Sequence, residues 1–359
     1  MESTNFSTWL DNMKLSHPLV IAGPCSAETE EQVMKIAHEL KNTDVTIFRA
    51  GIWKPRTRPG TFEGTGAKAL PWLQRVKKET GLLTAVEIAN AQHAKIALEF
   101  DIDILWLGAR TTVNPFAVQE IAEAIQGTEK IVLVKNPINP DLELWMGAIE
   151  RLFKMGVKNL GAIHRGFSSF RKSKYRNIPS WQIPIDLKAK FPTLPIINDP
   201  SHICGNREGI FDVSQTALDL KFNGLMIETH CNPDEAWSDA KQQIKPARLI
   251  EIMDELKVRK DRFVKEESIS KLNALRKEIN AKDDQLLETL SERMLLVENI
   301  GKAKKESNVA VLQNSRWQEI LHKVIDKGEE QGLSKNFIEK IFKAIHQESI
   351  AHQEKIIKG

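Results

Sequence analysis

The feature that most constrains the fold is a strict alternation of short apolar, β-branched segments with helical patterns. The apolar segments are residues 19–23, 45–50, 82–88, 104–109, 131–135, 160–165, 195–199 and 224–229. Amphipathic patterns separate them, among them residues 29–41, 64–79, 114–125 and 141–156. Eight such units over about 250 residues predict an α/β fold of the (β/α)8 TIM barrel type. A doubly wound open sheet is the alternative.

The pattern of apolar and charged residues changes near residues 256–266, where strand patterns end and long charged helices begin. Residues 269–305 hold an apolar helical stripe without proline, which predicts a helix longer than about 50 Å. One small domain cannot bury so long a helix, so we expect a homodimer through this region. Two further helices are expected at 314–330 and 334–357. We therefore predict a barrel over 1–258, a linker over 259–265 and a small all-α helical domain over 266–359.

Composition excludes several classes of protein. The 51 Lys and Arg residues nearly balance the 48 Asp and Glu residues, which argues against a nucleic-acid partner. No segment has the length and apolarity of a membrane span, and the N-terminus lacks a signal-type apolar core. These features predict a cytoplasmic protein with no membrane partner. Three cysteines are too few for a disulfide framework, and Cys204 and Cys231 are interpreted as packing residues.

The residues expected at the ends of the eight strands are mostly charged or reactive. In chain order they are Cys25, Arg49, Glu87, Arg110, Lys135, Arg165, His202 and Glu228. The carboxyl ends of barrel strands meet at one mouth, so four of these side chains would form a positive pocket there. The segment 54–59, "KPRTRP", adds Lys54, Arg56 and Arg58. Such a pocket is suited to phosphate and carboxylate groups.

A second subset of these residues has the chemistry of metal ligands. Cys25, His202 and Glu228 supply a thiolate, an imidazole and a carboxylate, and Asp239 offers a fourth ligand from the loop after the last strand. This set predicts a divalent metal ion, with Mn expected first and Fe, Co or Zn also compatible. His164 is adjacent to Arg165, so alternation directs it away from the mouth, and His230 near Glu228 is likewise interpreted as a packing residue.

Seven short motifs make the resemblance to a known family specific. "GPCS", "KPRT", "GARTT", "VKNP", "HRGF", "DPSH" and "IETH" followed by "SDA" resemble, in order, the motifs of 3-deoxy-D-arabino-heptulosonate 7-phosphate (DAHP) synthases, especially the short microbial subtype. The resemblance covers roughly residues 10–255. It implies a TIM barrel that condenses phosphoenolpyruvate with erythrose 4-phosphate.

The resemblance also implies roles for individual residues. Cys25, His202, Glu228 and Asp239 would hold the metal, and Lys54 would transfer protons near the sugar aldehyde. Phosphoenolpyruvate would contact Arg49, Arg110, Lys135 and Arg165, while Lys54, Arg56 and Thr57 would receive erythrose 4-phosphate. A related synthase that uses arabinose 5-phosphate typically carries a "KANR"-like stretch where this chain has "KPRT", which favours the four-carbon sugar.

The tail is similar to the small all-helical chorismate mutases, which rearrange chorismate to prephenate. The matching residues, which the resemblance assigns to the mutase site, are Arg276, Arg293, Lys304, Arg316, Ser349 and Gln353. Two positions depart from the family: Gln313 replaces an acidic residue, and Trp317 replaces the glutamate expected to bind the substrate hydroxyl. The expected protein is thus bifunctional, with feedback inhibition by the mutase ligand. A monofunctional synthase with a regulatory or dimerising helical tail is the alternative.

Overall fold

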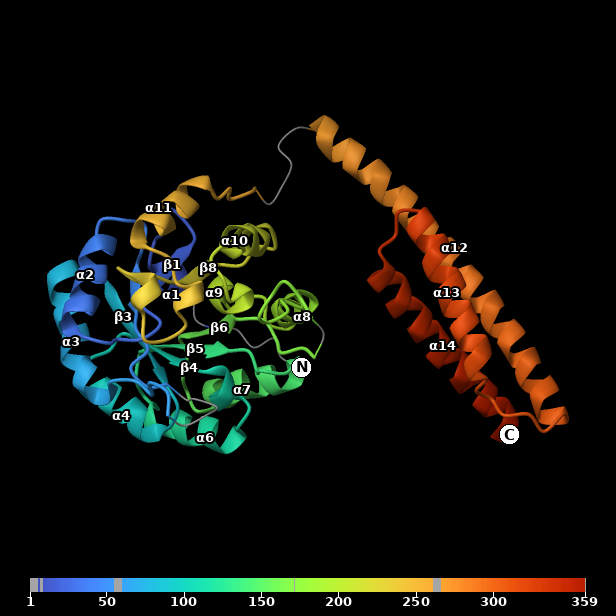
Figure 1. Cartoon of the computed structure of the whole chain (residues 1–359), viewed down its shortest axis with the longest axis horizontal. Coiled ribbons are helices and arrows are strands. Elements are labelled where there is room, and N and C mark those ends of the chain that lie inside the picture. The colour runs from blue at the N-terminus through green and yellow to red at the C-terminus, as the bar shows by residue number, and fades with distance from the viewer. Residues whose placement is uncertain (1–5, 7–8, 55–59, 171, 261–265, 359) are drawn as a thin grey trace. The chain divides into compact units, whose positions relative to one another are not determined.

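The structure, a computed structural model, describes residue 6 and residues 9–54, 60–170, 172–260 and 266–358. It divides into two compact units, Met1–Arg259 and Lys260–Gly359. The first unit is a closed barrel of eight parallel strands in chain order, in which the last strand pairs with the first (Figure 1). The strands are β1 (Leu19–Gly23), β2 (Ile47–Arg49), β3 (Leu83–Ile88), β4 (Ile104–Leu107), β5 (Ile131–Lys135), β6 (Leu160–His164), β7 (Ile196–Asn198) and β8 (Gly224–Glu228). The predicted TIM barrel is confirmed, and the doubly wound alternative is wrong.

The longer helices of the first unit surround the barrel (Figure 1). The helices described in this unit are α1 (Trp9–Asn12), α2 (Glu30–Leu40), α3 (Leu70–Thr80), α4 (Ala91–Glu99), α5 (Ala109–Thr112), α6 (Pro115–Ala124), α7 (Leu142–Lys154), α8 (Gln182–Lys190), α9 (Pro200–Cys204), α10 (Ile210–Asp219) and α11 (Pro246–Glu255). Short 3-10 turns occur at Gly66–Ala69, Pro233–Glu235 and Ala240–Gln242. Several helices begin at side-chain caps, since Thr29 accepts from the Gln32 amide and Asp141 from the Leu144 amide.

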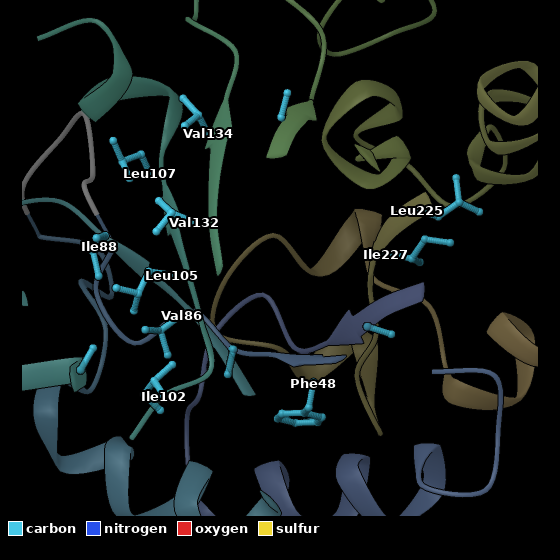
Figure 2. Packing of buried hydrophobic residues seen from close by; sticks show 14 of the residues in the cluster. Phe48, Val86, Ile88, Ile102, Leu105, Leu107, Val132, Val134, Leu225 and Ile227 are labelled. Carbon is cyan, nitrogen blue, oxygen red and sulfur yellow. The ribbon is translucent and has the colours of Figure 1, made fainter. Parts of the chain in front are cut away.

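Strand residues alternate between two buried layers because successive side chains point to opposite faces. Phe48, Val86 and Ile227 lie in the layer between strands and helices (Figure 2). Ile47, Trp106 and other residues of the opposite parity fill the barrel interior. Arg49, Lys135 and Glu228 have this interior parity and occupy the last position of their strands. Alternation therefore directs these three charged side chains inward at the carboxyl end of the barrel.

The second unit is a helical hairpin with a third helix. Its elements are α12 (Glu266–Glu306), α13 (Asn314–Glu330) and α14 (Lys335–Lys358), and α14 contacts both other helices. Gly301 permits close packing, since a Cβ there would lie 3.3 Å from the Gln353 Cα. Leu286, Leu287 and Leu296 of the 41-residue α12 remain exposed within this unit. In the part of the chain that the structure describes, no helix has both the length and the apolarity that a membrane crossing requires.

Candidate active site

The predicted strand-end residues gather at the carboxyl end of the barrel, but two of them lie on short helices. Arg110 lies in α5 and His202 in α9, short helices that follow β4 and β7. Cys25 lies two residues past the end of β1. Local chemistry explains α9, because the Asp199 side chain accepts from the His202 amide and Pro200 occupies the first turn.

Cys25 is fully buried and contacts groups of both charges. Its Sγ lies 2.8 Å from the Lys54 Nζ and 3.3 Å from the Asp239 Oδ2. Burial, with the nearby Glu228 and Asp239 carboxylates, raises the pKa of the Cys25 thiol to about 12, although Lys54 opposes the shift. The thiol therefore stays protonated unless a stronger positive charge than Lys54 stands beside it.

His202 is oriented by a buried carboxylate. Its Nδ1 lies 2.8 Å from the Asp199 Oδ2, and its Nε2 lies 3.9 Å from the Glu228 Oε1. Asp199 also accepts a hydrogen bond of 2.9 Å from the Lys135 Nζ. Burial would raise the pKa of Asp199, but His202 and Lys135 outweigh it and hold this pKa well below its ordinary value. A carboxylate on one nitrogen and an open second nitrogen is the arrangement typical of a metal-binding histidine.

Glu228 is fully buried at the end of β8 and is held from two sides. Its Oε1 pairs with the Arg49 Nη1 at 3.1 Å, and its Oε2 accepts from the Gln242 Nε2 at 2.7 Å. Burial would raise the pKa of Glu228, yet the nearby His202 and Arg49 hold it below its ordinary value. Glu228 is therefore ionised in a place where only paired charges are stable.

The four predicted metal ligands form two pairs rather than one closed cluster. Across the described ranges, no three His, Cys, Asp or Glu side chains stand together at metal-binding spacing. Cys25 instead pairs with Asp239 and His202 with Glu228. Each acidic donor contacts a protein cation: Lys54 on Cys25, Arg49 on Glu228 and Arg176 on Asp239. The donor types, sulfur, imidazole nitrogen and carboxylate oxygen, fit a divalent transition-metal ion.

Cations predicted to bind phosphate lie beside these pairs. Burial, together with the positive charges of Arg176 and Arg110, lowers the pKa of the Arg165 guanidinium to about 10, although Asp199 opposes the shift. Lys135 is buried, whereas Arg110 is exposed. Arg176 and Arg110 thus lie within electrostatic range of Arg165, an arrangement that a bound anion would stabilise.

A buried tryptophan separates the cations at the base of the site. The Trp106 ring lies 4.9 Å from the Arg49 Cζ and 5.9 Å from the Lys135 Nζ. Its Nε1 donates to the Glu87 Oε2 at 3.0 Å. This ring stabilises both cations from its face and gives Glu87 a structural role.

Sequence reasoning missed the residues that hold the Asp239 loop. The Gln243 Oε1 accepts from the Cys25 amide at 2.9 Å, and the Glu28 Oε1 accepts from the Trp237 amide at 2.7 Å. Ser26 and Ser238 also share a hydrogen bond. Adjacent glutamines after "SDA" were a usable signal, because two amides in a loop near a metal site typically fix it through hydrogen bonds.

Several predicted residues fall elsewhere. Arg56, Thr57 and Arg58 lie outside the described residues. His164 lies in the helix layer, where its Nε2 is 2.7 Å from the Pro179 carbonyl oxygen, and His230 packs 3.4 Å from Glu28. Both histidines are packing residues, as predicted. Cys204 is buried in a small apolar cluster, and Cys231 packs at the edge of the main core.

The helical unit brings three of its six predicted site residues together. The Arg293 Nη1 donates to the Ser349 Oγ at 2.7 Å, and the Gln353 Nε2 lies 3.3 Å from the Ser349 carbonyl oxygen. The Gln353 Oε1 is buried without a hydrogen-bond partner among the described residues. An unpaired buried acceptor is costly and points to a missing polar ligand.

The other three residues have different partners or positions. The Lys304 Nζ donates to the Val311 carbonyl oxygen at 2.6 Å, between α12 and α13. Arg316 is exposed and pairs with Glu319 of its own helix. Arg276 lies 17 residues before Arg293 on one continuous helix, a separation of about 25 Å. Arg276 therefore cannot serve the same site as Arg293 within one chain.

Comparisons with known proteins match both units. A model of the DAHP synthetase I family matches residues 14–264, and a model of chorismate mutase type II matches residues 275–354. A phospho-2-dehydro-3-deoxyheptonate aldolase from Thermotoga maritima is 31% identical over 238 residues, 66% of this chain and 68% of the relative. A 2-dehydro-3-deoxyphosphooctonate aldolase from Wolinella succinogenes is 28% identical over 268 residues, 66% of this chain and 97% of the relative.

A solved structure supports the same family assignment. The crystal structure of phospho-2-dehydro-3-deoxyheptonate aldolase (DAHP synthase) from Thermotoga maritima aligns with a TM-score of 0.61 at 29% identity, covering 67% of this chain and 68% of that chain. The chain therefore belongs to the DAHP synthetase I family, and it joins to its synthase barrel a chorismate mutase domain of type II, two enzymes of aromatic biosynthesis on one polypeptide.

Proposed function

We propose that the barrel condenses phosphoenolpyruvate with erythrose 4-phosphate to DAHP and phosphate, and that the helical domain rearranges chorismate to prephenate. The observation that carries the first reaction is Asp199, whose carboxylate contacts both Lys135 and His202. It joins an anion-binding group to a metal-type ligand set, which a condensation of a phosphorylated enol with an aldehyde requires. The synthase spans 1–258, the linker 259–265 and the mutase 266–359.

The metal ligands in this proposal are Cys25, His202, Glu228 and Asp239. A bound divalent ion supplies Lewis acidity toward the aldehyde oxygen of the sugar. The mixed sulfur, nitrogen and oxygen set suits Mn, Fe, Co or Zn, and we propose Mn first. Lys54 and Arg176 now contact Cys25 and Asp239, so both cations have to give way when a metal binds.

The barrel's own side chains bind and orient the substrates. Arg110, Lys135 and Arg165, with Arg49 beside them, hold the phosphate and carboxylate of phosphoenolpyruvate so that its enol carbon faces the aldehyde. Lys54 is close enough to the ligand set to transfer a proton at the aldehyde oxygen. Lys54, Arg56 and Thr57 of "KPRT" receive erythrose 4-phosphate.

The mutase reaction needs orientation and charge but no covalent intermediate. Arg293, Lys304, Arg316, Ser349 and Gln353 form the site, and Arg276 completes the site of the partner chain in a homodimer. Two features support the dimer: the distance of about 25 Å between Arg276 and Arg293, and the exposed leucines of α12.

The enzyme works in the cytoplasm, and chorismate or prephenate on the helical domain inhibits the synthase.

Product identification with the full chain tests this proposal. The Mn-loaded protein should convert phosphoenolpyruvate and erythrose 4-phosphate to a seven-carbon product seen by mass spectrometry, and it should consume chorismate in a separate assay. Arabinose 5-phosphate, offered at the same concentration, should react far more slowly. A preferred eight-carbon product would contradict the proposed sugar, and stable chorismate would favour the monofunctional alternative.

A further inference from the structure

Two aromatic rings stack beside the Arg293 group of the helical unit. The Trp317 ring of α13 and the His346 ring of α14 lie 3.9 Å apart between centroids, with 16° between their planes. Both side chains are partly buried. A parallel stack at this distance fixes the position of the imidazole plane.

His346 occupies the same face of α14 as two predicted site residues. Ser349 and Gln353 follow it by three and seven residues, the spacing of one helical face. Ser349 accepts the hydrogen bond from Arg293, and Arg293 lies close enough to His346 to affect its titration. Residues of α12, α13 and α14 therefore converge on the imidazole.

Both nitrogens of the His346 ring are available for hydrogen bonding. Burial, and secondarily the charge of Arg293, lowers the pKa of His346 below its ordinary value, so the ring is neutral at pH 7. A neutral imidazole carries one donor and one acceptor nitrogen in the ring plane, and stacking covers only a face. Neither nitrogen bonds to another residue within the described ranges.

The replacement of the family glutamate by Trp317 bears on the role of the His346 ring. Where the mutase resemblance expects a glutamate for the substrate hydroxyl, this chain has an indole, which cannot accept a hydrogen bond. The same indole stacks on His346, whose ring nitrogens carry no hydrogen bond among the described residues. Trp317 thus cannot accept a hydrogen bond from the substrate hydroxyl, whereas a ring nitrogen of His346 can.

We propose that His346, held in place by Trp317, hydrogen-bonds the ring hydroxyl of chorismate in place of the missing acid. His346 is then a substrate-binding residue, and Trp317 is a positioning residue that acts through it. The inference rests on the proposed mutase function and adds to it the group that selects a hydroxylated substrate.

The test uses the full chain and two substrates, chorismate and an analogue in which hydrogen replaces the ring hydroxyl. His346→Phe keeps an aromatic ring against Trp317 but removes both nitrogens. We expect this variant to lower kcat/KM for chorismate about tenfold, the effect of one lost hydrogen bond in a partly buried site. With the analogue, wild type and variant should react at equal rates. His322→Phe, on the exposed side of α13, is the matched control and should change neither value.

The outcomes separate this inference from the function on which it rests. Equal kcat/KM for chorismate in wild type and His346→Phe, or equal losses on both substrates, would overturn the role of His346 alone. A wild-type chain without mutase activity would overturn the proposed function first. If His346→Phe does not fold, His346→Gln should keep the preference for the hydroxylated substrate, and loss of that preference would count against the proposal.

Discussion

At the scale of single residues, the barrel site depends on a few buried groups that each serve two neighbours. Asp199 fixes both His202 and Lys135, and the carboxylate of Glu228 contacts Arg49 and Gln242. Removing one partner would leave a buried charge unpaired, at a cost of about 3–5 kcal/mol. Variants at Lys135 would therefore disturb His202 as well, which makes the exposed Arg110 a cleaner probe of anion binding.

Cys25→Ala should abolish bound metal and condensation while leaving mutase kinetics unchanged, because the thiol belongs to the barrel site alone. Metal content of the purified protein and both assays on one sample measure this. Cys231→Ala, which removes a partly buried thiol at the edge of the core, should keep both activities. A Cys25→Ala chain with full metal and full synthase turnover would show that Cys25 is no ligand.

Arg110→Ala should raise KM for phosphoenolpyruvate by about tenfold to a hundredfold, since a charged hydrogen bond contributes about 1.5–3 kcal/mol. Metal affinity, measured by calorimetry, should stay at the wild-type value. Arg151→Ala on α7 removes an exposed arginine away from the barrel mouth and is the control. An unchanged KM would exclude Arg110 from the phosphoenolpyruvate site.

At the scale of elements, periodicity predicted the strands well because every strand is buried on both faces and flanked by turn residues. It failed at α5 and α9, where the helices have only 4 and 5 residues and no room for a periodic pattern. The pattern therefore predicts Arg110 and His202 at strand ends, although β4 and β7 end a few residues earlier. The hydrogen bonds that hold the Asp239 loop, such as the one from the Cys25 amide to Gln243, join residues 218 positions apart, so periodicity within one segment does not predict them.

Gly23→Ala should lower the free energy of unfolding of the barrel by about 2 kcal/mol or more. The φ of Gly23 is +143°, and a Cβ there would lie 2.1 Å from the Arg49 carbonyl oxygen, so β1 and β2 would have to separate beside the site. Denaturant unfolding measures the loss. Gly147→Ala in α7 meets no atom within 4 Å and should be neutral or stabilising. Similar stability for both variants would argue against the close approach of β1 to Arg49.

At the scale of the whole molecule, two compact units carry two separate sets of chemical groups. The end of the alternating strand and helix patterns near residues 256–266 predicts this division, because a long charged helix without strand signals does not fit the repeating units of a barrel. The over-long helix also predicts a homodimer through this region, and the exposed leucines of α12 form an apolar surface of the kind that a second copy would cover, so dimerisation stays a prediction.

Saturating prephenate should slow the condensation catalysed by the full chain, with a coupling of about 1–3 kcal/mol between the two sites. Coupling is expected because a ligand that prefers one arrangement of the domains shifts their equilibrium. Arg293→Ala, which removes the guanidinium that contacts Ser349, should keep synthase turnover and lose the response. Identical synthase rates with and without prephenate would mean that the two enzymes act independently.

The central claim is that one chain holds a metal-dependent condensing site and a metal-independent rearranging site, and removal of metal tests it most directly. The full chain is treated with a chelator, and both activities are measured on the same sample before and after addition of Mn²⁺. We predict that condensation disappears and returns with Mn²⁺, while chorismate consumption stays constant throughout. Condensation that survives complete metal removal, or mutase activity that falls and recovers with it, would contradict the claim.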